Sequence, residues 1–127
     1  MEQPTSESPF KGKTGIRRLI NATGYSIDGL RAAWRHESAF RQVCLLAAVG
    51  IGLALWLPLP AWGRALIAFA HILSIVVELL NSAIEAAVDH TSLDHHLLAK
   101  RAKDLGSAAQ LASLLNMAII WSVVLLN

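Results

Sequence analysis

The sequence predicts an all-helical membrane protein with an N-terminal amphipathic surface helix followed by three transmembrane helices. Hydrophobic residues make up 54% of its 127 residues and charged residues only 16%, whereas soluble domains carry roughly 25% charged residues. The mean hydropathy is positive, at +0.48. Three apolar segments are each long enough to cross a hydrocarbon core of about 30 Å, which needs roughly 20 helical residues. A chain of this length forms one domain, and a soluble core of three such helices is the less favoured alternative.

The N-terminal third of the chain contains no long apolar run. Residues 1–13 are polar and include proline, so we expect a disordered tail rather than a signal peptide. Residues 14–42 carry apolar side chains at helical spacing with basic residues between them, a pattern typical of a helix at the level of the lipid headgroups. We expect Gly24 and Gly29 to interrupt this helix. Residues 14–127 together form the predicted membrane-embedded domain.

The three predicted spans cover about residues 43–62, 65–88 and 107–126. The first and third contain no charged residue over 20 positions. Because proline cannot continue a helix, Pro58 and Pro60 predict that the first spanning helix ends near Leu57. The second span is interrupted by a histidine and two glutamates, whereas each of the others is uniformly free of charge.

Basic residues set the predicted orientation, because Lys and Arg collect in cytoplasmic segments. The connection between the first two spans holds only Arg64, whereas the residues before the first span and the connection between the second and third are rich in Lys and Arg. The N-terminus and the second connection are therefore predicted to face the cytoplasm. Within the second connection we expect a loop over 89–94 and a helix that resumes by Leu97. The basic residues of these two cytoplasmic segments are Lys11, Lys13, Arg17, Arg18, Arg31, Arg35, Arg41, Lys100, Arg101 and Lys103.

The second span carries a stripe of polar side chains, Glu78, Asn81, Glu85 and Asp89, at spacings of three, four and four. This spacing places them on one face of a helix, with Glu78 and Glu85 about 10.5 Å apart along its axis. A carboxylate at the bilayer centre costs at least about 2.5–3.5 kcal/mol. The stripe must therefore face water, a cation or a partner, and Glu78 is its deepest member. In contrast, we expect His71 to be a packed or hydrogen-bonded core residue.

Carboxylates at a cytoplasmic interface are suited to Mg²⁺, a hard cation that binds few protein ligands and keeps waters and phosphates. Phosphoryl transfer needs such a metal, cationic groups for the phosphates and a base near the acceptor hydroxyl. Glu78 could meet a hydroxyl that stays in the membrane, which describes a lipid kinase. The residues alone leave open a proton or cation pathway, or a polar network that only joins helices. The chain has no phosphate-binding loop of the GxxxxGK[ST] type, and its net charge of +2 does not indicate nucleic-acid binding.

Three blocks of sequence resemble the small prokaryotic diacylglycerol kinases. They are ELLNSAIEAAVD (78–89), AKDLGSAA (102–109) and TGYSIDGLRAAWRHESAFRQ (23–42), and the resemblance extends from Gly15 to the end of the chain. It implies a homotrimer in the bacterial inner membrane, with active sites between subunits at the cytoplasmic surface, that phosphorylates diacylglycerol with MgATP to give phosphatidic acid. An undecaprenol kinase with the same chemistry is the alternative acceptor, and a small proton- or cation-conducting oligomer is the alternative from another class.

The resemblance also implies roles for individual residues. Glu78 corresponds to the catalytic base, and Asn81 to a polar residue near the reacting centre. Glu37 and Glu85 correspond to the carboxylates that hold Mg²⁺ with ATP. The implied ATP contacts are Arg18, Tyr25, Glu37, Glu85, Asp94, His95, His96, Lys103 and Asp104. The implied lipid site comprises Arg18, Thr23, Gly24, Tyr25, Ser26, Ile27, Asp28, Ala32, Ala33, Trp34, Arg35, Trp56, Glu78 and Ser107.

The chain departs from the family pattern at three of these positions. His95 replaces an aromatic residue that could pack on adenine. Thr23 replaces an alanine and Asp28 a basic residue, and these two changes alter the expected lipid pocket but leave the chemical residues intact. A transition-metal site formed by His90, His95 and His96 with Asp94 is a disfavoured alternative, because their spacing matches no zinc pattern.

Overall fold

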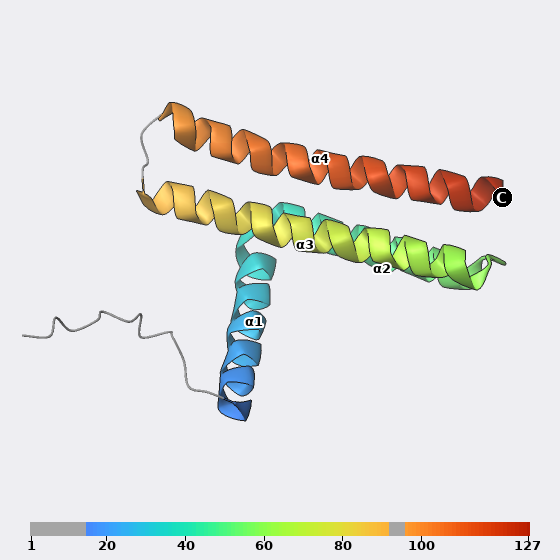
Figure 1. Cartoon of the computed structure of the whole chain (residues 1–127), viewed down its shortest axis with the longest axis horizontal. Coiled ribbons are helices and arrows are strands. Elements are labelled where there is room, and N and C mark those ends of the chain that lie inside the picture. The colour runs from blue at the N-terminus through green and yellow to red at the C-terminus, as the bar shows by residue number, and fades with distance from the viewer. Residues whose placement is uncertain (1–14, 92–95) are drawn as a thin grey trace, which may run out of the picture. The chain divides into compact units, whose positions relative to one another are not determined.

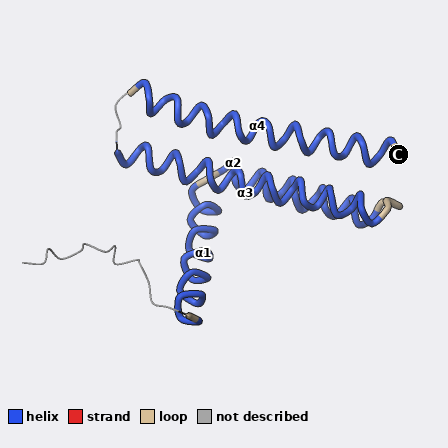
Figure 2. The backbone as a smooth tube through the Cα atoms, viewed as in Figure 1, coloured by secondary structure: helices blue, strands red, loops and turns tan. Residues whose placement is uncertain are grey.

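The computed structural model describes residues 15–91 and 96–127. The predicted N-terminal tail and the predicted ATP contacts Asp94 and His95 therefore lie outside the described residues. Four helices follow one another: α1 (Ile16–His36), α2 (Ser38–Trp56), α3 (Ala61–Thr91) and α4 (Leu97–Leu126) (Figure 1). The tube drawing shows only helices joined by short connections in the described part of the chain (Figure 2). The all-helical prediction is confirmed.

Helix α1 is continuous over 21 residues. The expected interruptions at Gly24 and Gly29 do not occur, because both glycines keep negative φ angles and a helix tolerates each glycine at a cost of about 1 kcal/mol. The amphipathic segment predicted for residues 14–42 is divided at Glu37, whose backbone is extended, with φ −115° and ψ 104°. The last residues of the predicted segment, from Ser38 on, belong to α2.

Helices α2, α3 and α4 are each long and apolar enough to cross a membrane. Helix α3 lies between the other two and packs against both. Most of their large apolar side chains, such as Leu45, Phe69 and Leu111, remain exposed in a single chain. Such surfaces are stable where hydrocarbon rather than water surrounds them. The structure thus supports three spans, with α3 as the central element.

Helix α2 ends at Trp56, next to the predicted end at Leu57. Arg64, at the start of α3, fixes this turn: its Nε donates to the Ala54 carbonyl (3.1 Å) and its Nη2 to the Leu57 carbonyl (3.0 Å). These carbonyls belong to the last turn of α2 and its C-cap, where the helix leaves acceptors without intrahelical partners. The single basic residue of the first connection therefore serves as a cap across the turn.

The connection between α3 and α4 is shorter than the sequence predicts. Helix α3 continues to Thr91, so the loop expected from Asp89 is wrong for Asp89, His90 and Thr91. The Thr91 hydroxyl returns to the carbonyls of Ala87 (3.1 Å) and Val88 (2.9 Å), which supports the last turn. Helix α4 begins at Leu97, as predicted.

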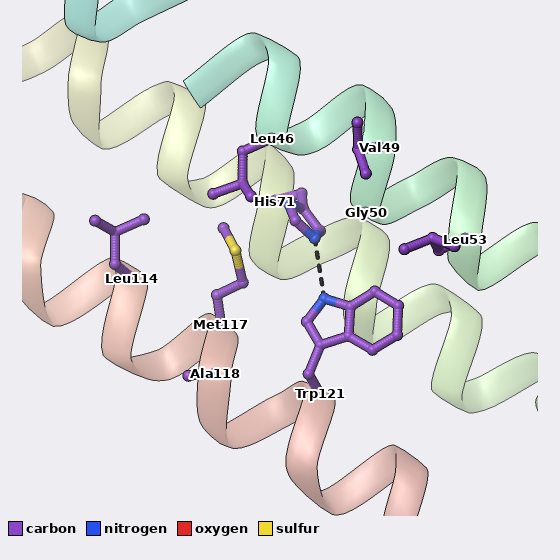
Figure 3. A pocket seen from close by; sticks show the side chains of 9 residues that line it. All are labelled: Leu46, Val49, Gly50, Leu53, His71, Leu114, Met117, Ala118 and Trp121. Carbon is purple, nitrogen blue, oxygen red and sulfur yellow. Dashed lines mark hydrogen bonds between the residues drawn. The ribbon is translucent and has the colours of Figure 1, made fainter. Parts of the chain in front are cut away.

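His71 and Trp121 join α3 to α4 in the interior. His71 is 1% exposed, and its Nε2 accepts a hydrogen bond of 3.1 Å from the Trp121 indole. The expectation that His71 is a hydrogen-bonded core residue is confirmed. The two rings border an apolar cavity of about 400 Å³ between α2, α3 and α4 (Figure 3). Gly50 of α2 lies against the imidazole, so a side chain there would collide with it.

Replacing Arg64 with methionine removes both hydrogen bonds to the end of α2. Each bond from a charged donor contributes about 1.5–3 kcal/mol where it is formed, so we expect a lower thermal midpoint in detergent micelles. The matched control is Arg101→Met, because Arg101 is exposed on α4. Equal midpoints for the two variants, measured by circular dichroism, would show that Arg64 is not a structural cap.

Candidate functional site

Glu78 is the centre of the site. It lies on α3, one turn after Ser74 and two turns after His71, and all three side chains are buried. Glu78 is 5% exposed. Their spacing of three and four residues makes them one stripe on the inner face of α3. A carboxylate is thus held inside the helical bundle, as the sequence predicts for the deepest polar residue of the stripe.

Two further carboxylates surround Glu78. Glu85 follows two turns later on α3, and Glu37 precedes α2; both lie close enough to Glu78 to act on it electrostatically. Glu37 makes no side-chain capping hydrogen bond, and both carboxylates are half-buried. The structure therefore places the two predicted metal ligands within electrostatic range of the predicted base, with Glu85 two turns from Glu78 along α3.

Contacts between residues on either side of Glu37 support its extended backbone. The Arg41 guanidinium donates to the carbonyls of Trp34 (2.6 Å) and Arg35 (3.5 Å), in the last turn of α1. The Trp34 and Phe40 rings meet edge to face, with their centroids 6.4 Å apart. These contacts join residues 34 and 35 to the first turn of α2 and flank the backbone of Glu37 on both sides.

Asn81 connects the stripe to α4. Its Nδ2 donates to Glu85 Oε1 at 3.4 Å, and its buried Oδ1 has no hydrogen-bond partner among the described residues. Gly106 of α4 passes directly over this oxygen, and a Cβ at Gly106 would collide with it. The glycine allows the close approach of α4, and an orphaned buried acceptor of this kind can take a donor from a ligand.

The ends of α3 and α4 are joined by Lys103 and Asp89, whose Nζ and Oδ1 atoms are 2.5 Å apart. Asp89 follows the charge-free part of α3, and Lys103 precedes the charge-free part of α4. The Asp89 carboxylate raises the pKa of Lys103 above its ordinary value, so Lys103 remains a cation. Asp104, the sequence neighbour of Lys103, pairs with Lys100, at 2.5 Å.

The remaining predicted residues are distributed over several elements. The implied nucleotide and lipid residues from Arg18 to Ala32 lie on the first part of α1, and their contacts stay a prediction. His96 is the N-cap of α4, and its Nδ1 accepts from the Leu98 amide at 3.2 Å. Ser107 is exposed beside Gly106. Trp56 is 81% exposed and lies at the opposite end of α2 from Glu37, so one chain does not bring it to the carboxylates.

The carboxylates suit a hard cation that keeps other ligands. Within residues 15–91 and 96–127, no group of three or more His, Cys, Asp or Glu side chains could hold a metal ion by itself. Mg²⁺ usually binds one or two carboxylates and completes its shell with waters and substrate phosphates. Glu37 and Glu85 provide such a donor set. The alternative histidine site includes His95, which lies outside the described residues.

A polar group between α3 and α4 was not recognised from the sequence. It consists of Ser74 on α3 with Gln110 and Ser113 on α4, which are joined by hydrogen bonds. Gln110 and Ser113 are three residues apart in a charge-free span. Polar residues three apart lie on one face of a helix. This spacing, in the span that packs against the carboxylate stripe, could have indicated that Gln110 and Ser113 face α3.

Comparison with known proteins gives a consistent result. The profile of the family described as prokaryotic diacylglycerol kinase matches residues 24–125. A diacylglycerol kinase of Pseudomonas aeruginosa is 52% identical over 122 residues, which cover 96% of this chain and 99% of the relative. Similar proteins of the same name occur in Helicobacter pylori, at 49% identity over 94% of this chain and 93% of the relative. Another, in Escherichia coli K12, is 46% identical over 88% of this chain and 92% of the relative.

Replacing Gly106 with alanine tests the close contact with Asn81. Alanine is the better helix former by about 1 kcal/mol, yet overpacking costs about 1–3 kcal/mol. We therefore expect Gly106→Ala to lower the thermal midpoint in micelles. Gly52→Ala is the matched control, because a Cβ at Gly52 meets no neighbour within 4 Å, and it should keep or raise the midpoint. If Gly106→Ala is as stable as this control, the contact between Asn81 and Gly106 is absent.

Proposed function

Because the chain belongs to the prokaryotic diacylglycerol kinase family, we propose that it transfers the γ-phosphoryl group of ATP to the free hydroxyl of diacylglycerol and so produces phosphatidic acid. The observation that carries this proposal is the buried carboxylate of Glu78, with Glu37 and Glu85 beside it. A membrane lipid presents its hydroxyl from the bilayer, and ATP arrives from water. A site for both substrates must combine a base deep in the bilayer with a phosphate site nearer to water. Along α3, Glu78 would be the deep base, and Glu85, two turns later, would lie at the phosphate site.

In the proposed reaction, the diacylglycerol hydroxyl oxygen attacks the γ-phosphorus of ATP. A new P–O bond forms, the bond from the γ-phosphorus to the bridging oxygen breaks, and ADP leaves. The Glu78 carboxylate takes the hydroxyl proton. Burial favours this role because few waters can compete for the carboxylate. Asn81, one turn away, corresponds in the family resemblance to a polar residue near the reacting centre, and its amide donates to Glu85.

Glu37 and Glu85 are the residues that would hold Mg²⁺. When bound with ATP, Mg²⁺ neutralises the charge that develops on the β- and γ-phosphates. The two carboxylates come from different elements, and the Arg41 guanidinium supports the backbone next to Glu37 by hydrogen bonds to the carbonyls of Trp34 and Arg35. Lys103, kept cationic by Asp89, is the described cation best suited to contact the phosphates. We also propose ATP contacts from Arg18, Tyr25 and Asp104, as the family resemblance implies.

We place this chemistry at the cytoplasmic side of the bacterial inner membrane, because ATP is a cytoplasmic substrate and the basic segments flank that side. We also propose a homotrimer with sites between subunits. The exposed apolar faces of α2 and α4 are compatible with such an assembly. Light scattering of the purified protein in micelles, corrected for detergent, should give the mass of three chains.

Replacing Glu78 with glutamine keeps the size of the side chain and removes its basicity. General-base catalysis contributes about 10²–10⁴-fold, so we expect turnover with labelled ATP and diacylglycerol in mixed micelles to fall at least about 100-fold. The thermal midpoint and the oligomeric mass should not change. Glu7→Gln, which makes the same chemical change before α1, should retain full activity.

A Glu78→Gln variant with more than half of the original turnover would contradict the role of Glu78 as the base. A wild-type protein that is folded but phosphorylates no lipid hydroxyl would contradict the kinase function itself. Supplying undecaprenol together with diacylglycerol in one assay separates the two acceptors, and we expect phosphatidic acid to be the main product.

A further inference from the structure

The side chain of Glu78 needs a partner that its own helix does not supply. It is 5% exposed in a helix that crosses the hydrocarbon region, where unpaired charges are costly. Of its neighbours on α3, Glu85 carries the same charge, and Asn81 donates its amide to Glu85. A packed helix can supply a donor, and the α4 side chain that reaches this face of α3 is Gln110, which contacts Ser74 one turn before Glu78.

The contacts of Gln110 fix which end of its amide faces α3. Ser113 donates its hydroxyl to Gln110 Oε1 at 2.7 Å, so the amide oxygen is occupied on the side of α4. The amide nitrogen lies 3.3 Å from the Ser74 hydroxyl and 3.4 Å from the Ser74 carbonyl. Rotating the amide by half a turn would set its oxygen against this carbonyl, two acceptors with no proton between them. The NH₂ group therefore faces α3.

An amide nitrogen carries two protons. One serves Ser74, which is fully buried, and the other is available to Glu78, one helical turn further along the same stripe. An interaction between the Gln110 amide and Glu78 is consistent with this arrangement. Within residues 15–91 and 96–127, no hydrogen bond joins Gln110, Ser74 or Ser113 to the predicted metal ligands Glu37 and Glu85.

We propose that Gln110 is a positioning residue that donates a hydrogen bond to Glu78 and holds its carboxylate toward the lipid hydroxyl, and that Ser113 locks the Gln110 amide in the required orientation. This inference rests on the proposed kinase function. Gln110 takes no proton and binds no phosphate. It restricts the rotation of Glu78, so that one carboxylate oxygen stays where the hydroxyl of diacylglycerol arrives. The Ser113 hydroxyl acts on Gln110 and only through it on Glu78.

The test compares turnover and KM in a set of variants. Gln110→Met keeps the length of the side chain and removes both donors, and we expect kcat to fall about tenfold with unchanged KM for ATP. Ser113→Ala should lower kcat about two- to fivefold, because the amide oxygen then loses its donor and only the Ser74 carbonyl still opposes rotation of the amide. Leu111→Met and Ser122→Ala are the controls: Leu111 is exposed, and the Ser122 hydroxyl donates, among the described residues, to the carbonyl of Ala118 in its own helix. Both controls should match the wild type.

A double-mutant cycle separates positioning from a general structural role. If Gln110 acts through Glu78, Gln110→Met should cause no further loss of turnover in a Glu78→Gln background. A tenfold loss in both backgrounds would overturn the proposal, as would wild-type kcat in Gln110→Met. If Gln110→Met does not fold, the same cycle with Ser113→Ala applies, and an equal loss with and without Glu78 overturns the proposal.

The outcomes also distinguish this inference from the function on which it rests. An inactive Glu78→Gln combined with a fully active Gln110→Met refutes only the role of Gln110. A fully active Glu78→Gln refutes the base and, with it, the residue that positions the base. A folded wild-type protein without lipid kinase activity refutes both proposals.

Discussion

One constraint governs the architecture: a carboxylate is buried in the middle of an apolar helix that crosses the membrane. Glu78 can occupy that place only if neighbouring helices bring polar groups to it. Helix α3 lies between α2 and α4, so both can do so. Helix α4 contributes Gln110 and Ser113, which form a hydrogen-bonded group with Ser74 on the same face of α3. The central position of α3 and the burial of Glu78 are thus two consequences of the same requirement.

The exposure of the polar side chains increases along α3 and forms a gradient. At the inner end of the stripe, Ser74 and Glu78 are buried, whereas Glu85 is half-buried and Asp89 is exposed. Close contacts at Gly50 and Gly106 let the neighbouring helices approach this stripe without a side chain between them. At the exposed end of the stripe, the ion pair between Asp89 and Lys103 joins α3 to α4. A substrate held in the bilayer and a nucleotide in water would meet along such a gradient, which is why the proposed function fits the geometry.

Much of this arrangement could be predicted from residue spacing. Helical periodicity placed the carboxylates on one face of the second span, and proline placed the end of α2 near Leu57. Local rules failed where tertiary contacts decide the outcome. Thr91 and Asp89 extend α3 beyond its expected end, and α1 continues through two glycines. Gln110 and Ser113 were missed because uncharged polar residues within a span carry little signal until the facing helix is known.

The central claim is that Glu78 and the carboxylates around it form a lipid kinase site. The most direct measurement is the transfer of labelled γ-phosphate from ATP to lipids supplied in mixed micelles, with the products separated by chromatography. The account predicts labelled phosphatidic acid from diacylglycerol, in a reaction that stops when Mg²⁺ is chelated and resumes when it is restored. A folded protein that leaves every lipid hydroxyl unlabelled, at saturating ATP and Mg²⁺, would contradict it.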